Sequence, residues 1–164
     1  MGSKLKAKQD SKKITPEAHL RSFIGRFDSK TQKLIRAVRA ALRKRFPTAN
    51  ELVYDYSNSV VIGYSPTEGG IDSTVAIAGR ADGVSLYFNE GKQLPDPKGL
   101  LLGSGRQTRF IPLEAASRLA HPDVKALIAA AVELAKVPMP STGKGALIIR
   151  SGGAKKKARP KSKK

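Results

Sequence analysis

The chain has 164 residues and carries 31 Lys and Arg against 13 Asp and Glu, which gives a formal net charge of +18. This length fits one domain, because single domains cluster near roughly 100–150 residues. The absence of cysteine excludes disulfides, thiolate nucleophiles and thiolate metal sites. No stretch approaches the roughly 18 apolar residues of a membrane span, and no apolar segment of a signal peptide follows the first lysines. We therefore expect a cytoplasmic protein with no membrane partner.

Most of the excess positive charge lies at the two ends of the chain. Residues 1–13 hold five Lys and one acid, residues 144–164 hold nine basic residues and no acid, and residues 14–143 hold 17 basic and 12 acidic residues. The last segment lacks the apolar side chains that could offset the entropy cost of ordering. The sequence therefore predicts a domain at 14–150, between a basic disordered tail at 1–13 and a Lys-rich disordered tail at 151–164.

Two amphipathic helices are predicted at the start of the domain. Thr15-Pro16-Glu17 is a helix start, with a hydroxyl N-cap, proline at the first helical position and an acid facing the helix dipole. The apolar stripe that follows has helical spacing and comprises Leu20, Phe23, Ile24 and Phe27. Asp28-Ser29 breaks this helix and can cap the next one, which Pro47 ends. The buried face of the second helix is predicted to comprise Leu34, Ile35, Val38, Ala41 and Leu42.

Short β-type runs separated by turn residues follow the two helices. The predicted strands are 51–57, with Leu52, Tyr54 and Tyr56 on one face, then 60–64, 74–78, 84–88 and 108–113. The connection from Gly79 to Gly83 ends in Asp-Gly, which is typical of a hairpin. Residues 114–120 are helical by propensity, and Pro122 opens a last helix that Pro138 and Pro140 close. This order predicts an α+β fold, in which a small antiparallel sheet of about five short strands is packed by N- and C-terminal helices on one face.

Several of these segments, in this order, are similar to a known family. They are the opening helix pair, E-L-V-Y-D-Y from Glu51, V-S-L-Y-F at 84–88, G-x-G-R-Q-T-R-F-I-P-L at 103–113 and P-M-P-S-T-G-K-G at 138–145. Together they resemble the YdhG-like domains, a bacterial family of mostly unknown function, over about residues 14–151. The resemblance implies an α+β fold with a small antiparallel sheet packed by helices. The segment 103–113 is its most specific part.

The residues predict no metal ion and no cofactor. One branch of the YdhG-like family is described as a frataxin-like iron chaperone. Iron binding of that kind needs clustered carboxylates, whereas the first two predicted helices contain only Glu17 and Asp28. His19 and His121 are isolated from one another, and His121 stands where it can cap the last helix. We therefore expect neither iron handling nor a zinc site.

The second predicted helix carries seven cations with no acid between them. Arg36, Arg39 and Arg43 share one face, and the sequence offers them no nearby acid. One interpretation is a stripe that faces the phosphates of a nucleic acid, and the other is an ordinary solvated helix face. The candidate nucleic-acid contacts are Lys33, Arg36, Arg39, Arg43, Lys155, Lys156 and Lys157.

A glycine-framed loop before the last predicted strand is the second candidate site. Glycine backbone amides can form a nest for an anion, which an arginine can bind through two hydrogen bonds. If the segment 142–145 folds back beside Arg106, the two would make one anion pocket. The candidate anion ligands are Ser104, Arg106, Thr108, Arg109 and Lys144. The alternative is a strand entry whose glycines satisfy only turn geometry.

Three functions remain open at this level. The favoured one is a non-enzymatic module that binds polyanions, with nucleic acid as the first candidate, through its tails and second helix. The alternatives are a domain that binds a small anionic metabolite, with or without catalysis, and a protein-interaction domain whose tails serve solubility. Stacking of bases on the tyrosines of the sheet is a further hypothesis, although the pattern of 53–56 is that of a half-buried strand. No nucleophile–base pair or convergent carboxylates are recognisable, so no catalytic residue is predicted.

Overall fold

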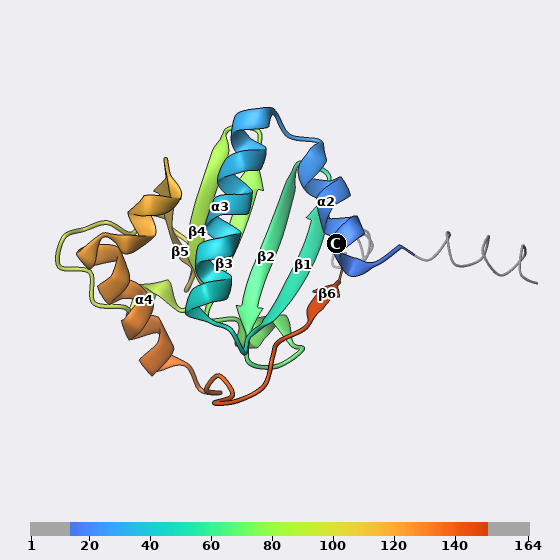
Figure 1. Cartoon of the computed structure of the whole chain (residues 1–164). Helices are drawn as coiled ribbons and strands as arrows, with labels where there is room; N and C mark the ends of the chain where they lie inside the picture. Colours follow the sequence, from blue (N-terminus) through green and yellow to red (C-terminus); the bar gives the residue numbers. More distant parts are fainter. Residues whose placement is uncertain (1–13, 151–164) are drawn as a thin grey trace, which may run out of the picture.

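The computed structural model describes residues 14–150, which form one sheet with helices on one of its faces (Figure 1). The helices are α2 (Pro16–Gly25), α3 (Ser29–Arg45) and α4 (Pro122–Leu134). The strands are β1 (Asn50–Tyr56), β2 (Ser59–Ser65), β3 (Val75–Arg80), β4 (Gly83–Phe88), β5 (Arg109–Leu113) and β6 (Leu147–Ile149). Three short 3-10 helices complete the fold, η1 (Gly70–Asp72), η2 (Gly91–Gln93) and η3 (Ala116–Ala120). The predicted α+β class is confirmed.

The predicted helix starts are built from side-chain caps. The hydroxyl of Thr15 accepts a hydrogen bond from the Ala18 amide at 3.1 Å, and the Asp28 carboxylate accepts one from the Thr31 amide at 2.7 Å. His121 caps α4, because its Nδ1 accepts the Asp123 amide at 3.2 Å. These contacts satisfy amides that the first turn of a helix leaves without backbone partners. All three caps were readable from the sequence.

The strand order across the sheet is β5-β4-β3-β2-β1-β6. Neighbouring strands from β1 to β5 pair antiparallel, while β6 pairs parallel with β1 at the sheet edge. β3 and β4 are joined through Ala81 and Asp82, and Gly83 adopts a φ of +140° there, which favours glycine. The structure therefore has six strands where the sequence predicted about five. β6 was missed because three residues carry little local pattern and pair with a strand far away in the chain.

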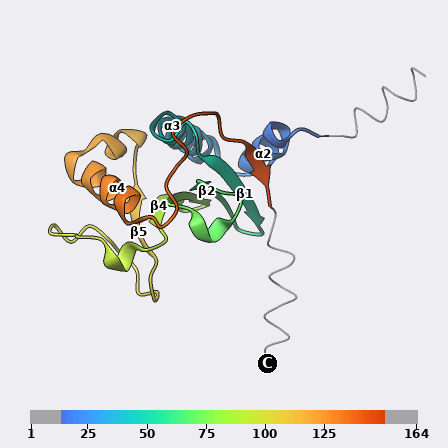
Figure 2. The ribbon, with the colours of Figure 1, turned by 90° about the horizontal axis from the view of Figure 1, so that it is seen from below.

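The hydrophobic core lies between the sheet and the helices. α3 crosses the middle of the sheet, α2 lies beside β1 and β6, and α4 covers the other end (Figures 1 and 2). Ile35, Val38 and Leu42 of α3 are almost completely buried against the inner sheet face. No helix among residues 14–150 is long and apolar enough to cross a membrane.

One local expectation differs from the structure. The segment predicted to be helical at 114–120 forms only the 3-10 helix η3, which is too short to develop an α-helical turn pattern. In β1 the side chains that face the helices are Glu51, Val53 and Asp55, since Arg39 of α3 binds Glu51 and Arg26 binds Asp55. The predicted grouping of Leu52, Tyr54 and Tyr56 on one face agrees with this alternation, and that face is turned away from the helices.

Candidate functional site

The solvent face of α3 is basic along most of its length. At 3.6 residues per turn, four exposed cations fall within an arc of about 120° and span about 21 Å along the helix. None of the four forms an ion pair within the described residues. We refer to these side chains as the α3 stripe, which comprises Lys30, Lys33, Arg36 and Lys44.

Arg39 does not belong to this stripe. Its side chain is 14% exposed, and its Nε and Nη2 each donate to a carboxylate oxygen of Glu51 at 2.9 Å. Its Nη1 and Nη2 also donate to Glu17, at 3.2 and 2.8 Å. The prediction that Arg39 lacks acidic partners is therefore wrong, while its contact with a phosphate stays a prediction. The acids come from α2 and β1, which are distant in sequence but pack on either side of this helix face.

Arg43 is partly paired with an acid, like Arg39, and partly exposed, like the stripe residues. Its Nε is 3.7 Å from Glu51, and its side chain is 52% exposed, so one side faces the acid and the other faces solvent. Arg43 and Lys44 line a hollow of about 440 Å³ together with Glu17, Glu51 and Lys144. The hollow thus joins the end of α3, the start of α2 and the segment that leads into β6. In this hollow the structure brings Lys144 near the cations at the end of α3.

The Tyr64 hydroxyl completes the buried cluster around Glu51. Tyr64 is 1% exposed and donates to Glu51 Oε2 at 2.7 Å. Burial, and then the negative charge of Glu51, raise the pKa of Tyr64 well above its ordinary value. The pKa of Arg39 is also raised, because its hydrogen bonds to Glu51 and Glu17 outweigh the effect of burial, which alone would lower it. The cluster thus keeps Arg39 charged and Tyr64 protonated.

The raised pKa of Tyr64 makes the protein sensitive to alkali. Above the usual tyrosine pKa of about 10 the unfolded state loses this proton while the folded state retains it, so stability falls as the pH rises. We expect the difference in free energy of unfolding between the wild type and Tyr64→Phe to shrink between about pH 8 and pH 11. Urea denaturation of both proteins at a series of pH values measures it. Two stability curves that stay parallel over this range would contradict the assignment.

The glycine-framed loop folds back on itself. Leu102 and Phe110 exchange backbone hydrogen bonds at 2.8 and 2.9 Å, and Arg109 Nη1 donates to the carbonyls of Gly105 and Thr108 at 2.7 and 2.8 Å. Arg109 therefore closes its own loop. The other candidate ligands of this loop are exposed and form no side-chain hydrogen bond within the described residues; they are Ser104, Arg106 and Thr108.

The structure does not join this loop to Lys144. The loop leads into β5 and Lys144 leads into β6, and these strands form opposite edges of the sheet. Five strand spacings of about 4.8 Å put them roughly 24 Å apart. The single anion pocket that the sequence analysis considered, between Arg106 and the segment 142–145, is therefore not formed. Strand order, which the local pattern does not encode, separates the two segments.

The remaining candidates fall into simple structural settings. Tyr54 and Tyr56 stack with their ring centroids 6.4 Å apart, and Tyr87 and Phe110 stack at 5.0 Å. Base stacking on these rings stays a prediction. Among residues 14–150, no group of three or more His, Asp or Glu side chains is arranged to hold a metal ion. Lys155, Lys156 and Lys157 lie outside the described residues.

Two sets of residues were missed from the sequence. The first is the Glu51–Tyr64 pair. The sequence did contain an indication of it, because Glu51 lies on the same face of its strand as the buried Val53. The second set lines a cavity between α4, η1 and η2 and includes Asp72, Glu90 and Gln107. Its members come from three separate loops, so no spacing in the sequence links them.

The fold and these sites define an α+β protein with a six-stranded sheet, helices on one sheet face and a basic helix across its middle. Comparison of the chain with protein-family models, with curated proteins and with solved structures found no match. The resemblance to the YdhG-like domains therefore stays a prediction.

Proposed function

We propose that this protein is a non-enzymatic module that binds nucleic acid through the α3 stripe and its basic terminal segments. The observation that carries the proposal is that four exposed cations share one helix face without an ion pair in the described part of the chain. Like charges at these helical spacings repel each other mildly. A polyanion lying along the helix relieves that repulsion and releases its own counterions.

The positions of Ile14 and Arg150 support a contribution of the basic terminal segments to the proposed nucleic-acid contact. α2 packs against β6, so Ile14 and Arg150 belong to segments that lie side by side at one sheet edge (Figure 1). The sequences beyond these two residues hold five Lys in 1–13 and seven basic residues in 151–164. The start of α2 also lines the hollow shared with Arg43 and Lys44. Both basic segments are therefore attached at the sheet edge that α2 and β6 form, and the start of α2 connects this edge to the hollow lined by Arg43 and Lys44.

Removal of the stripe should weaken DNA binding and flatten its salt dependence. Each cation that contacts a phosphate of double-stranded DNA contributes about 0.9 to the slope of log affinity against log salt concentration. We expect a variant with all four stripe residues changed to Gln to lose up to about 3.6 from this slope. Fluorescence anisotropy of a labelled duplex, titrated with the full chain at several salt concentrations, measures it.

A matched control variant distinguishes the effect of the α3 stripe from the effect of lowering the net charge. Three Lys and one Arg elsewhere on the exposed surface can be changed to Gln in the same way, namely Lys92, Arg106, Lys125 and Lys136. This variant has the same net charge as the stripe variant and should keep most of the slope. Equal losses in both variants would mean that α3 is not the contact surface. Removal of residues 151–164 then tests the C-terminal contribution separately.

A further inference from the structure

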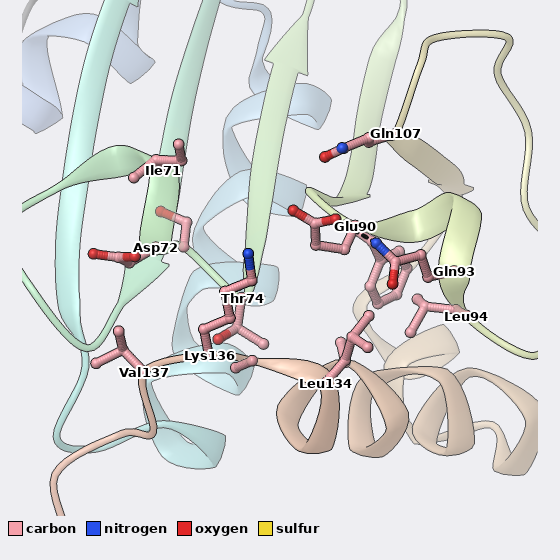
Figure 3. A pocket seen from close by; sticks show the side chains of 14 residues that line it. Ile71, Asp72, Thr74, Glu90, Gln93, Leu94, Gln107, Leu134, Lys136 and Val137 are labelled. Carbon is pink, nitrogen blue, oxygen red and sulfur yellow. Dashed lines mark hydrogen bonds between the residues drawn. The ribbon is translucent and has the colours of Figure 1, made fainter.

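A cavity of about 310 Å³ lies between the end of α4 and the 3-10 helices η1 and η2 (Figure 3). We refer to it as the α4 pocket. It shares no lining residue with the α3 stripe. Its volume is at the lower end of the range of small-molecule sites.

Apolar side chains gather around this pocket. Ile71, Leu134 and Val137 are 87%, 37% and 38% exposed, and all three line it. They are three of the five large hydrophobic side chains that are exposed within residues 14–150. Exposed apolar residues are ordinary when they are scattered singly, whereas a group around one cavity marks a binding site. The occupant should therefore have an apolar body.

The polar part of the pocket carries negative charge. Asp72 and Glu90 both line it, and neither forms an ion pair within the described residues. Gln93 donates to Glu90 at 2.9 Å, and a Gln107 amide turned with its nitrogen toward Glu90 would donate to both carboxylate oxygens at 3.1 Å. Asp72 accepts a hydrogen bond from Thr67 at 2.8 Å. Neutral donors thus hold both carboxylates in place and leave their charges unneutralised.

The end of α4 adds to this negative field. The helix has 13 residues and ends at Leu134 without a basic residue in its last turn, and its final residues line the pocket. The last carbonyls of a helix carry the negative end of its dipole and attract cations. Two carboxylates and one helix end therefore act on the same cavity in a chain that is otherwise strongly basic.

Lys136 shows what kind of group the pocket accommodates. Its side chain extends into the cavity, with its ammonium toward the space that Asp72 and Glu90 flank in Figure 3. It forms no ion pair with either acid. An alkylammonium chain therefore already enters the pocket, and its charge is not held there by a close contact. A ligand with the same chemistry can take its place while Lys136 turns out into solvent.

We propose that the α4 pocket binds a small aliphatic amine, with its ammonium groups held by Asp72 and Glu90. The alkyl body of the ligand packs on Leu134, Val137 and Ile71. Asp72 and Glu90 lie on opposite sides of the pocket in Figure 3, with the Asp72 carboxylate turned outward at the pocket rim. A linear diamine that spans the pocket therefore reaches both acids, and a monoamine reaches one. Lys136 competes with the ligand for the same negative field.

Calorimetric titration of the full chain with cadaverine, pentylamine and pentanoate tests the proposal. These probes have the same chain length and carry two, one and no ammonium groups. Cadaverine should bind more tightly than pentylamine, and pentanoate should not bind. Glu90→Gln and Asp72→Asn should each lower the affinity for cadaverine about tenfold, because a charge-assisted hydrogen bond becomes a neutral one. Lys136→Met should raise the affinity for cadaverine severalfold, because it removes the competing ammonium.

Glu133→Gln is the matched control for the loss of a carboxylate. Glu133 is exposed on α4, lies outside the pocket and forms no ion pair within residues 14–150, so this variant should bind cadaverine like the wild type. Three results would each overturn the proposal: equal weakening in Glu133→Gln and Glu90→Gln, binding of pentanoate as tight as that of cadaverine, or no binding of either amine at millimolar concentration by both the wild type and Lys136→Met. None of these readouts depends on nucleic acid.

Discussion

Replacement of Arg39 by alanine should lower the free energy of unfolding by about 3–5 kcal/mol. Glu51 has a side chain that is only 9% exposed, and Arg39 provides its two shortest charged contacts. Without Arg39 this carboxylate stays buried beside Tyr64 with only Arg43, at 3.7 Å, as a remaining cation. The penalty comes from a buried charge that has lost its partner. Urea denaturation followed by circular dichroism measures the loss.

Arg36→Ala is the matched control for this experiment. Arg36 is exposed on the same helix and forms no ion pair within the described residues, so its removal should change stability by less than about 0.5 kcal/mol. Joint replacement by Arg39→Met, Glu51→Leu and Tyr64→Phe should cost less than Arg39→Ala alone, because no buried polar group then lacks a partner. Equal losses for Arg36 and Arg39 would contradict the role assigned to the buried cluster.

Gly145→Ala should also destabilise the fold strongly, by about 3 kcal/mol. A Cβ atom at this position would overlap the carbonyl group of Ala49, which is part of the backbone and cannot swing away. The adjoining chain is held closely, since the Glu51 amide donates to the Ala146 carbonyl at 2.8 Å. Relief of the overlap therefore requires β6 to move away from β1. The loss appears in urea denaturation and as faster hydrogen exchange at the Glu51 amide.

Gly25→Ala separates this steric effect from the general effect of adding a methyl group. A Cβ at Gly25 meets no atom within 4 Å, and the residue lies at the end of α2. Alanine restricts the unfolded chain more than glycine does, so this variant should be neutral or more stable by about 0.4–1 kcal/mol. If Gly145→Ala were as stable as Gly25→Ala, the close approach of residue 145 to β1 would be wrong.

Local pattern was sufficient for most secondary-structure elements of this fold. Thr15, Asp28 and His121 cap helices because side-chain acceptors next to a helical apolar pattern satisfy the first free amides. The β-type runs at β1 to β5 were also recognised from local sequence, since their composition and the turn residues between them are contained within a few residues. Lys33 and Arg36 of the α3 stripe were among the candidates named from the sequence, but the face predicted there joined Arg36 to Arg39 and Arg43.

Long-range packing decided the parts of the candidate sites that the pattern missed. Arg39 was indistinguishable from Arg36 in the sequence, and only the docking of α2 and β1 supplied Glu17 and Glu51 to one of them. The α4 pocket likewise joins loops that are separated by whole strands and helices.

The amino-acid sequence by itself determined the α+β class, the helix caps and the concentration of positive charge on α3 and at the chain ends. These properties depend on neighbouring residues or on composition. Only the tertiary structure decided which arginine is buried, that β6 completes the sheet edge, and that the loop at 103–109 and Lys144 lie on opposite edges. Those outcomes depend on strand order and helix docking, which are set by contacts between residues far apart in the chain.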